Sequence, residues 1–176
     1  MKQLLQRCES GEQSAQLEIY KRYYRAMYNT ALRILNNSFD AEDMMQESFL
    51  IAFTKLSTFK GEVTFGSWLK RIVINKCLTQ LKRNKRFEEV KLEVKRNEEV
   101  LDEVVDYSTA KSEVILNKIN ELKDNYRIAL TLHLIEGFDY EEVSEIMNIS
   151  YQNSRTTISR AKEKLRKLLA IELQLN

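Results

Sequence analysis

The sequence FKGEVTFGSWLKRIVINKCLTQLKRNKR at residues 59–86 decides how the rest of the chain is interpreted. It opens as a short loop that contains glycine, and it continues with the pattern of a helix over about 67–83. Three aromatic residues lie at its start: Phe59, Phe65 and Trp68. From position 70 to position 86 it has seven bases and no acid. Aromatic faces beside a run of cations suit unstacked bases on a phosphate backbone, because stacking contributes about 1–3 kcal/mol per base. The stretch therefore predicts contact with one part of a DNA site.

The composition favours an all-α protein. The 176 residues include no proline and only four glycines, the residues on which tight turns depend. The net charge is +2, and no apolar run approaches the ~18 residues of a membrane span. The N-terminus lacks the pattern of a signal peptide, so we expect a cytoplasmic protein. Cys8 and Cys77 are isolated and the chain has one histidine, so we expect packing roles for the thiols and no metal site.

Two helices are predicted before the opening stretch. Residues 11–35 carry an apolar stripe at spacings of three and four, which indicates one buried face: Leu17, Tyr20, Tyr24, Met27, Tyr28, Ala31 and Ile34. We expect a second helix from Ala41 to about Leu56, with Asp40 as its N-cap. Acids in its first turn suit the helix dipole, but Gln46 and Glu47 lie beyond that turn. Their neighbour Leu50 leaves two interpretations open, a solvated face and a protein-binding face.

The chain changes character after residue 86. Residues 87–109 contain eight acids, which repel phosphates and predict a linker. This linker divides the chain into two small helical domains, 1–86 and 110–176. Within the second we expect helices over 110–122 and 125–136, with His133 as a structural or surface residue and not a ligand or catalyst.

A helix-turn-helix follows in the second domain. The sequence DYEE at 139–142 is a capping box that opens a short helix, and Ser150 caps a longer basic one after a tight turn. We expect Ile158, Ala161, Leu165 and Leu168 to point inward. Six early residues of this helix have side chains that read base edges and grip phosphates: Gln152, Asn153, Arg155, Thr156, Ser159 and Arg160. The alternative is a helical hairpin with a solvated basic face.

Three motifs in this order resemble the extracytoplasmic-function sigma factors, a group of the sigma-70 family. DAEDMMQESF at 40–49 resembles region 2.2 of that family, and FKGEVTFGSWLKRI at 59–72, followed by Asn75, resembles regions 2.3 and 2.4. EGFDYEEVSEIMNIS at 136–150 and the basic helix at 155–166 resemble region 4. The resemblance covers nearly the whole chain, and it implies a promoter-specificity subunit of RNA polymerase that is not itself an enzyme and needs no cofactor.

The resemblance also implies roles for individual residues. The face that docks on the clamp helices of the polymerase β′ subunit corresponds to Asp43, Gln46, Glu47, Phe49 and Leu50. The part that captures a flipped base of the −10 element corresponds to the loop at 59–67, with Phe59, Trp68, Lys70 and Asn75 around it, and the basic tail from Lys76 to Arg86 is expected mainly to follow phosphates. The residues expected to bind −10 DNA are together Phe59, Phe65, Trp68, Lys70, Arg71, Asn75, Lys82 and Arg83. The basic helix that begins after Ser150 matches the one that reads the −35 element in the major groove, while the β flap holds its domain. An anti-sigma factor is implied as a further partner.

Four positions depart from the family pattern. Thr79 stands where Asp is common, Lys70 where an aromatic is common, and Lys123 where Pro is common. Ser154 replaces an apolar residue, which predicts a slightly looser helix-turn-helix core.

Three other classes of protein fit the sequence less well. A free-standing helix-turn-helix regulator would use the first half as a ligand or dimer domain, which does not need aromatics beside cations. A helical adaptor that binds polymerase without DNA would leave both basic stretches idle. An enzyme is disfavoured, because the sequence has no Ser/His/Asp set, no metal cluster and no phosphate-cradling glycine loop.

Overall fold

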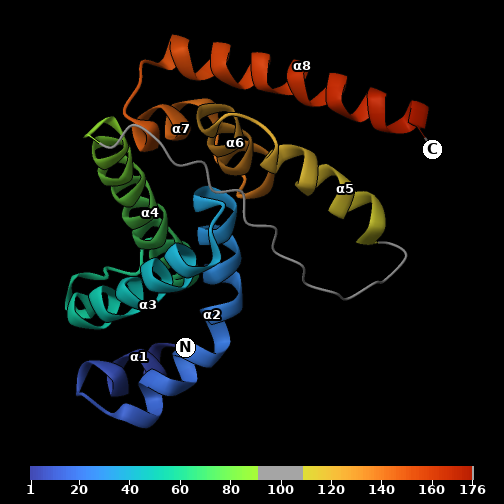
Figure 1. The fold of residues 1–176 in the computed structure, drawn as a ribbon. Helices are drawn as coiled ribbons and strands as arrows, with labels where there is room; N and C mark the ends of the chain where they lie inside the picture. The colour runs from blue at the N-terminus through green and yellow to red at the C-terminus, as the bar shows by residue number, and fades with distance from the viewer. Residues whose placement is uncertain (91–108, 176) are drawn as a thin grey trace. The chain divides into compact units, whose positions relative to one another are not determined.

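The computed structural model describes residues 1–90 and 109–175 (Figure 1). Every regular element in these ranges is a helix, which confirms the all-α prediction. The chain divides into two compact units, Met1–Asn97 and Glu98–Asn176. Most of the predicted acidic linker, residues 91–108, lies outside the described residues.

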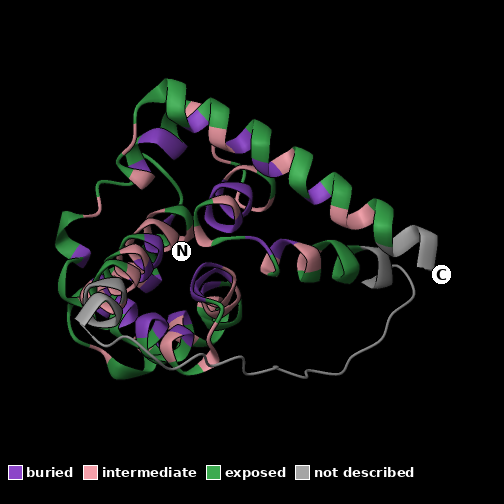
Figure 2. Ribbon diagram, turned by 45° about the horizontal axis from the view of Figure 1, so that its top comes forward, coloured by how far each residue is buried: buried purple, intermediate pink, exposed green. Residues whose placement is uncertain are grey.

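Three long helices build the first unit. They are α2 (Gln13–Leu35), α3 (Ser38–Thr54) and α4 (Phe65–Val90), and each packs on the other two. A short helix α1 (Lys2–Glu9) covers the start of α2, and a 3-10 turn η1 (Leu56–Thr58) follows α3. Burial alternates along the helices, with one side inward and the other exposed (Figure 2). The core of this unit is formed by apolar side chains that include Ile19, Met27, Ile34, Met45, Phe49, Leu69, Val73, Ile74 and Cys77.

Gly66 permits the close approach of α4 to α2. A Cβ atom at this position would lie 2.9 Å from Cε1 of Tyr23, inside normal contact distance. The Tyr23 ring also packs edge-on against Phe65 at 5.5 Å between centroids. The hydrogen atom of glycine therefore decides how closely the start of α4 lies on α2.

Several sequence predictions for the first unit were wrong in detail. Asp40 is not the N-cap of α3, because Asn37 one turn earlier takes that role and its side chain accepts a 2.9 Å bond from the Asp40 N–H. Leu56 belongs to η1 and not to α3. On α2, Leu17 and Tyr24 are 52% and 44% exposed. The buried face of that helix passes instead through Ala15 and Ile19.

Helix α4 is longer than predicted at both ends. It begins at Phe65 because Thr64 supplies a cap, its hydroxyl accepting a 3.1 Å bond from the Ser67 N–H. It continues to Val90, four residues into the predicted linker. Lys, Arg and Glu are good helix formers, so a change of charge sign does not by itself end a helix.

The second unit contains the predicted helix-turn-helix. Its elements are α5 (Thr109–Asn120), α6 (Asp124–Leu130), a π-helix η2 (Thr131–Ile135), α7 (Tyr140–Met147) and α8 (Tyr151–Leu175). Helices α5, α6 and α7 all pack on α8. The predicted helix over 125–136 is thus α6 followed by η2, where Glu136 N–H bonds Thr131 C=O at 3.0 Å.

Local signals for the helix-turn-helix were correct. The Asp139 side chain accepts bonds from the N–H groups of Glu141 and Glu142. In the other direction, the Glu142 carboxylate accepts a 2.8 Å bond from the Asp139 N–H. Asn148 closes α7 in the left-handed conformation, with φ 54°. Ser150 Oγ then accepts a 3.2 Å bond from the Asn153 N–H at the start of α8.

The core of the second unit largely follows the predicted pattern. Ile158, Ala161 and Leu165 are buried as expected, and Leu168 is half-buried. The single histidine is structural, which is one of the two roles predicted for it. His133 Nδ1 lies 2.9 Å from the Phe138 carbonyl oxygen, and its ring stacks on Tyr140 at 4.7 Å.

Candidate functional site

The predicted protein-binding face lies on the exposed side of α3. Asp43, Gln46 and Glu47 are exposed, and Leu50 is 67% exposed. Gln46 Nε2 donates a 3.1 Å bond to Glu42 Oε1, which adds a third carboxylate group to those of Asp43 and Glu47 on this surface. This side of α3 therefore presents acids and an amide around an exposed leucine.

Phe49 does not share this surface, contrary to the prediction. It is 2% exposed, with its ring 4.9 Å from Tyr20 and 6.0 Å from Phe53 between centroids. On a helix, residue 49 lies only about 60° around the axis from residue 46, so Phe49 is at the boundary between the exposed face and the core. Phe49 supports α3 from behind.

The sequence analysis missed Phe39 in the first turn of α3. Its side chain is 76% exposed. It precedes Asp43 by four residues and Leu50 by eleven, which places the three on one side of the helix. With Asp40 as the predicted N-cap, Phe39 lies before the expected helix, whereas the observed N-cap Asn37 places it in the first turn.

The predicted aromatic site is a packed cluster at the start of α4. Phe59 lies 5.8 Å from Phe65 and 5.3 Å from Trp68 between ring centroids, and Phe65 lies 5.7 Å from Trp68. Phe65 is only 3% exposed, so its ring offers DNA almost no surface in this structure. Its position under Tyr23 and Phe59 makes it the floor of the cluster. Phe59 and Trp68 are half-buried and keep part of their faces at the surface.

Phe59 also borders a cleft that the sequence did not predict. The cleft has a volume of about 490 Å³ and lies between α1 and the loop after η1. Its lining residues are Lys2, Leu5, Gln6, Glu9, Leu56, Phe59, Lys60, Gly61 and Val63. Helix α1 has a buried side at Leu4 and Cys8, and this packing sets the cleft wall.

Cations follow the aromatic cluster along α4. Lys82, Arg83 and Asn75 are exposed, whereas Lys70 and Arg71 are half-buried. Thr79, where the family often has Asp, donates its hydroxyl to the Asn75 carbonyl at 2.8 Å. Lys76 forms an ion pair with Glu47 across α3 and α4. The acidic and basic surfaces of this unit are therefore directly connected.

Helix α8 exposes the full set of predicted base-reading side chains: Gln152, Asn153, Arg155, Thr156, Ser159 and Arg160. The sequence analysis did not include Tyr151, the first residue of α8. Its ring is 49% exposed and lies under the Arg155 guanidinium, 5.9 Å from Cζ to the ring centroid. An aromatic residue four positions before an arginine was the signal for this pair.

Ser154 is buried between α7 and α8. It has no exposed surface, and its Oγ donates a 2.9 Å bond to the carbonyl oxygen of Tyr140. The hydroxyl group therefore links the two helices of the helix-turn-helix by a hydrogen bond. A serine at this position was predicted from the sequence to loosen the core between them.

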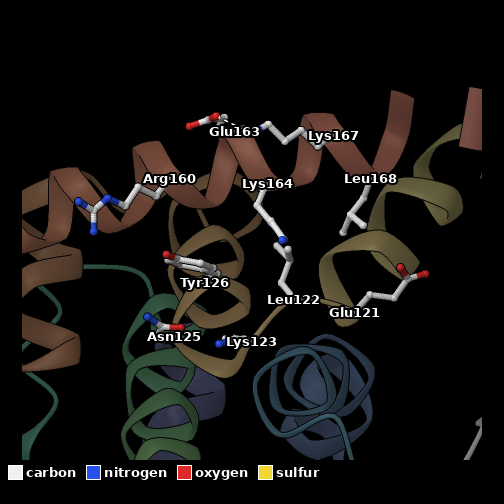
Figure 3. Close-up of a pocket in the computed structure, with 10 residues that line it drawn as sticks. All are labelled: Glu121, Leu122, Lys123, Asn125, Tyr126, Arg160, Glu163, Lys164, Lys167 and Leu168. Atoms are coloured by element: carbon white, nitrogen blue, oxygen red, sulfur yellow. Dashed lines mark ion pairs between the residues drawn. The ribbon is translucent and has the colours of Figure 1, made fainter. Parts of the chain in front are cut away.

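A groove of about 660 Å³ runs beside α8 in the second unit (Figure 3). Arg160, Lys164 and Leu168 line it from α8, and Asn125 and Tyr126 line it from α6. Glu163 and Lys167 also border the groove and pair with each other at 2.8 Å. Arg160 thus belongs both to the predicted base-reading set and to the rim of this groove.

Metal ligands and thiols are two further kinds of reactive group. Within residues 1–90 and 109–175 no three His, Cys, Asp or Glu side chains gather as a metal site. Burial raises the pKa of Cys77 to about 12 and also raises the pKa of Cys8, so both thiols stay protonated. No helix among the described residues is both long enough and apolar enough to cross a membrane.

Comparison with known proteins matches both units. The family model for Sigma-70 region 2 matches residues 19–87, and that for Sigma-70 region 4 matches residues 112–165. The ECF RNA polymerase sigma factor SigW of Bacillus subtilis is 31% identical over 96% of this chain and 96% of its own. The ECF RNA polymerase sigma-E factor of Haemophilus influenzae is 29% identical over 91% of this chain and 90% of its own.

Solved structures share the fold. The sigma factor RpoE of Bartonella quintana, in complex with the anti-sigma factor NepR, has a TM-score of 0.69 at 23% identity. That match covers 88% of this chain and 96% of RpoE. CnrH, in complex with the cytosolic domain of CnrY, has a TM-score of 0.57 at 23% identity over 96% of both chains. The chain belongs to the ECF group of sigma-70 RNA polymerase sigma factors.

Proposed function

We propose that the chain directs core RNA polymerase to specific promoters and helps to open the −10 element, while polymerase supplies the catalysis. The observation that carries this proposal is the coexistence of two kinds of surface. One unit has an acidic face on α3 beside an aromatic and cationic face on α4, and the other has a helix-turn-helix with an exposed polar helix. A sigma factor needs both kinds, because it must hold polymerase and DNA together.

Polymerase binding is assigned to the exposed side of α3. Four residues are exposed together there: Asp43, Gln46, Glu47 and Leu50. Phe49 is buried beneath them and packs α3 on the core. Charged groups at such a surface steer association and fix register. The partner surface is the pair of clamp helices of the β′ subunit, and the β flap holds the second unit.

Contact with the −10 element is assigned to the start and the exposed side of α4. Phe59 and Trp68 offer partial ring faces beside Lys70, Arg71 and Asn75. Opening DNA costs a few kcal/mol for each unstacked base, and capture of a base against an aromatic surface offsets part of this cost. Lys82 and Arg83 then follow phosphates further along the helix.

Contact with the −35 element is assigned to α8, which enters the major groove as the second helix of the helix-turn-helix. Its exposed arginines, amides and hydroxyls are the groups that read base edges. We also expect an anti-sigma factor that covers the polymerase-binding faces. A free-standing helix-turn-helix regulator is not favoured, because the first unit also matches a sigma-factor region.

The test is transcription by core polymerase, with and without the chain, from promoters mapped after its induced expression. Transcription that starts only when the chain is present is the expected result. Binding of the chain alone to duplex promoter DNA, with no effect on core polymerase, would instead identify a free-standing regulator. Changes at Phe59, Lys70 or Asn75 should alter which promoters open, whereas changes at Lys82 or Arg83 should weaken all of them equally.

A further inference from the structure

Two large hydrophobic side chains stand out on the outer side of α3. Phe39 is 76% exposed and Leu50 is 67% exposed, the highest values among the large hydrophobic residues that the structure describes. They are eleven residues apart, which is about three helical turns, so they lie on the same side of the helix. Their separation along the axis is about 16 Å. Single exposed hydrophobic residues are common, but two of them on one helix face with carboxylates between them form a surface that a partner of opposite charge can cover.

Polar residues occupy the three turns between these two ends. Asp43 and Gln46 lie between them on the same face, while Glu42 and Glu47 lie at its edges, and all four are exposed. We call Phe39, these four residues and Leu50 the α3 ridge. The ridge is apolar at both ends and acidic in the middle.

This pattern limits what can bind. A partner must place cations opposite the carboxylates and an apolar pocket opposite each end. A helical segment with basic residues along its middle meets these requirements, since it can lie along three turns of α3. A second copy of the same ridge does not, because its carboxylates would face like charges.

We propose that Phe39 is a further anchor of the polymerase-binding surface, and that it contacts the same clamp helices that were assigned above to the rest of the α3 ridge. The proposal rests on the proposed function and adds to it the residue that extends the surface by one turn at its N-terminal end. Phe39 enters an apolar pocket of the partner at that end, and Leu50 enters another. Aromatic anchors of this kind dominate the free energy of many interfaces.

The experiment measures the affinity of the full-length chain for core polymerase by fluorescence titration. The variants are Phe39→Ala, Leu50→Ala, and Leu17→Ala as a matched control, because Leu17 is 52% exposed on α2 and belongs to no proposed surface. Phe39→Ala should weaken binding about tenfold or more, whereas Leu17→Ala should change it less than about twofold. Circular dichroism should show equal thermal unfolding, since Phe39 contributes little to the core.

A second measurement identifies the partner segment. A photocrosslinking amino acid at position 39 should join the chain to the clamp helices of the β′ subunit. A Phe39→Ala variant that binds polymerase like Leu17→Ala would overturn the proposal while leaving the proposed function intact. If the unaltered chain failed to bind core polymerase, the proposed function itself would be wrong. A dimer of the chain alone, lost on Phe39→Ala, would assign the ridge to self-association and also overturn the proposal.

Discussion

Lys76 Nζ on α4 lies 2.5 Å from Glu47 Oε2 on α3. The pair joins the predicted polymerase-binding face of α3 to the predicted DNA-binding helix α4. From the sequence these were predicted as two separate surfaces. The side chain of Lys76 is 31% exposed and that of Glu47 is 50% exposed. The Lys76 ammonium group is therefore already paired with a carboxylate, which would have to be displaced before the group could bind a phosphate.

Replacement of Lys76 by Ala should change DNA binding less than replacement of Lys82. A cation that neutralises a phosphate releases counterions, so its loss lowers the salt slope of binding by about 1. We expect this loss for Lys82→Ala, and a clearly smaller one for Lys76→Ala. The measurement is the affinity of the polymerase complex for promoter DNA as a function of salt. Equal slopes for the two variants would show that the Glu47 pair opens when DNA binds.

Gly66→Ala should destabilise the first unit. The new Cβ would meet Tyr23 Cε1 at 2.9 Å, and the Tyr23 ring is packed against Phe65. Crowding of this kind costs about 1–3 kcal/mol, which exceeds the gain of about 0.5–1 kcal/mol in helix propensity. Chemical denaturation should therefore show a net loss in the free energy of unfolding.

The control for this prediction is the same change in a Tyr23→Ala background. Without the ring, only the helix-propensity gain remains, and Gly66→Ala should become neutral or stabilising. If Gly66→Ala costs the same free energy in both backgrounds, contact with Tyr23 is not the cause.

The helix-turn-helix could be predicted from sequence because its signals are local. The bonds of Asp139 and Glu142 lie within one turn, and Ser150 caps the helix that follows it. Such bonds form between neighbours in sequence, so a motif of a few residues is enough to identify them. The same holds for the exposed face of α8, which follows directly from the helical period.

Burial at the edges of helices could not be predicted in the same way. Phe65 was expected at the DNA surface, but Tyr23 on α2 packs against it. The helical pattern places Phe49 on the apolar side, where Tyr20 packs against it, and only the family resemblance assigned it to the polymerase surface. Which edge of an amphipathic helix is covered depends on the neighbouring helices, and the sequence pattern does not contain that information. The cleft beside Phe59 needs α1, which packs through tertiary contacts with α2 and η1.

Lys123→Pro should stabilise the second unit. Lys123 is the N-cap of α6 with φ −57° and ψ 147°, values that proline adopts without strain. Proline there restricts the unfolded chain, which is worth about 0.4–1 kcal/mol. Thermal unfolding should show a higher midpoint. The matched control is Lys118→Pro inside α5, which should cost about 3 kcal/mol because it breaks the helix. A lower midpoint for Lys123→Pro would contradict the prediction.

Acid should weaken the contact between α1 and α2. The hydrogen bonds from Arg7 and Ser14 lower the pKa of Glu12 from 4.5 to about 2. A lowered pKa means that the stabilisation is complete above about pH 4.5 and is lost as the pH falls towards 2. The difference in unfolding free energy between the unaltered chain and Glu12→Gln should therefore shrink over this range. The side chains of Arg7 and Glu12 are both exposed, so salt at about 1 M should screen their attraction and remove most of the difference in unfolding free energy. A difference independent of pH would show that the Glu12 charge is not involved.

Tyr151 should act on DNA through Arg155. Its ring lies 5.9 Å from the Arg155 guanidinium, and a cation held over an exposed aromatic face gains about 0.5–1 kcal/mol. An arginine ordered in this way loses less side-chain entropy when it binds a base edge. Tyr151→Ala should therefore weaken binding of the polymerase complex to −35 DNA severalfold, and Tyr151→Phe, which keeps the ring, should not. In a background that already carries Arg155→Ala, the Tyr151→Ala change should have almost no further effect. Fully additive losses in this double-mutant cycle would mean that Tyr151 contacts the DNA independently of Arg155.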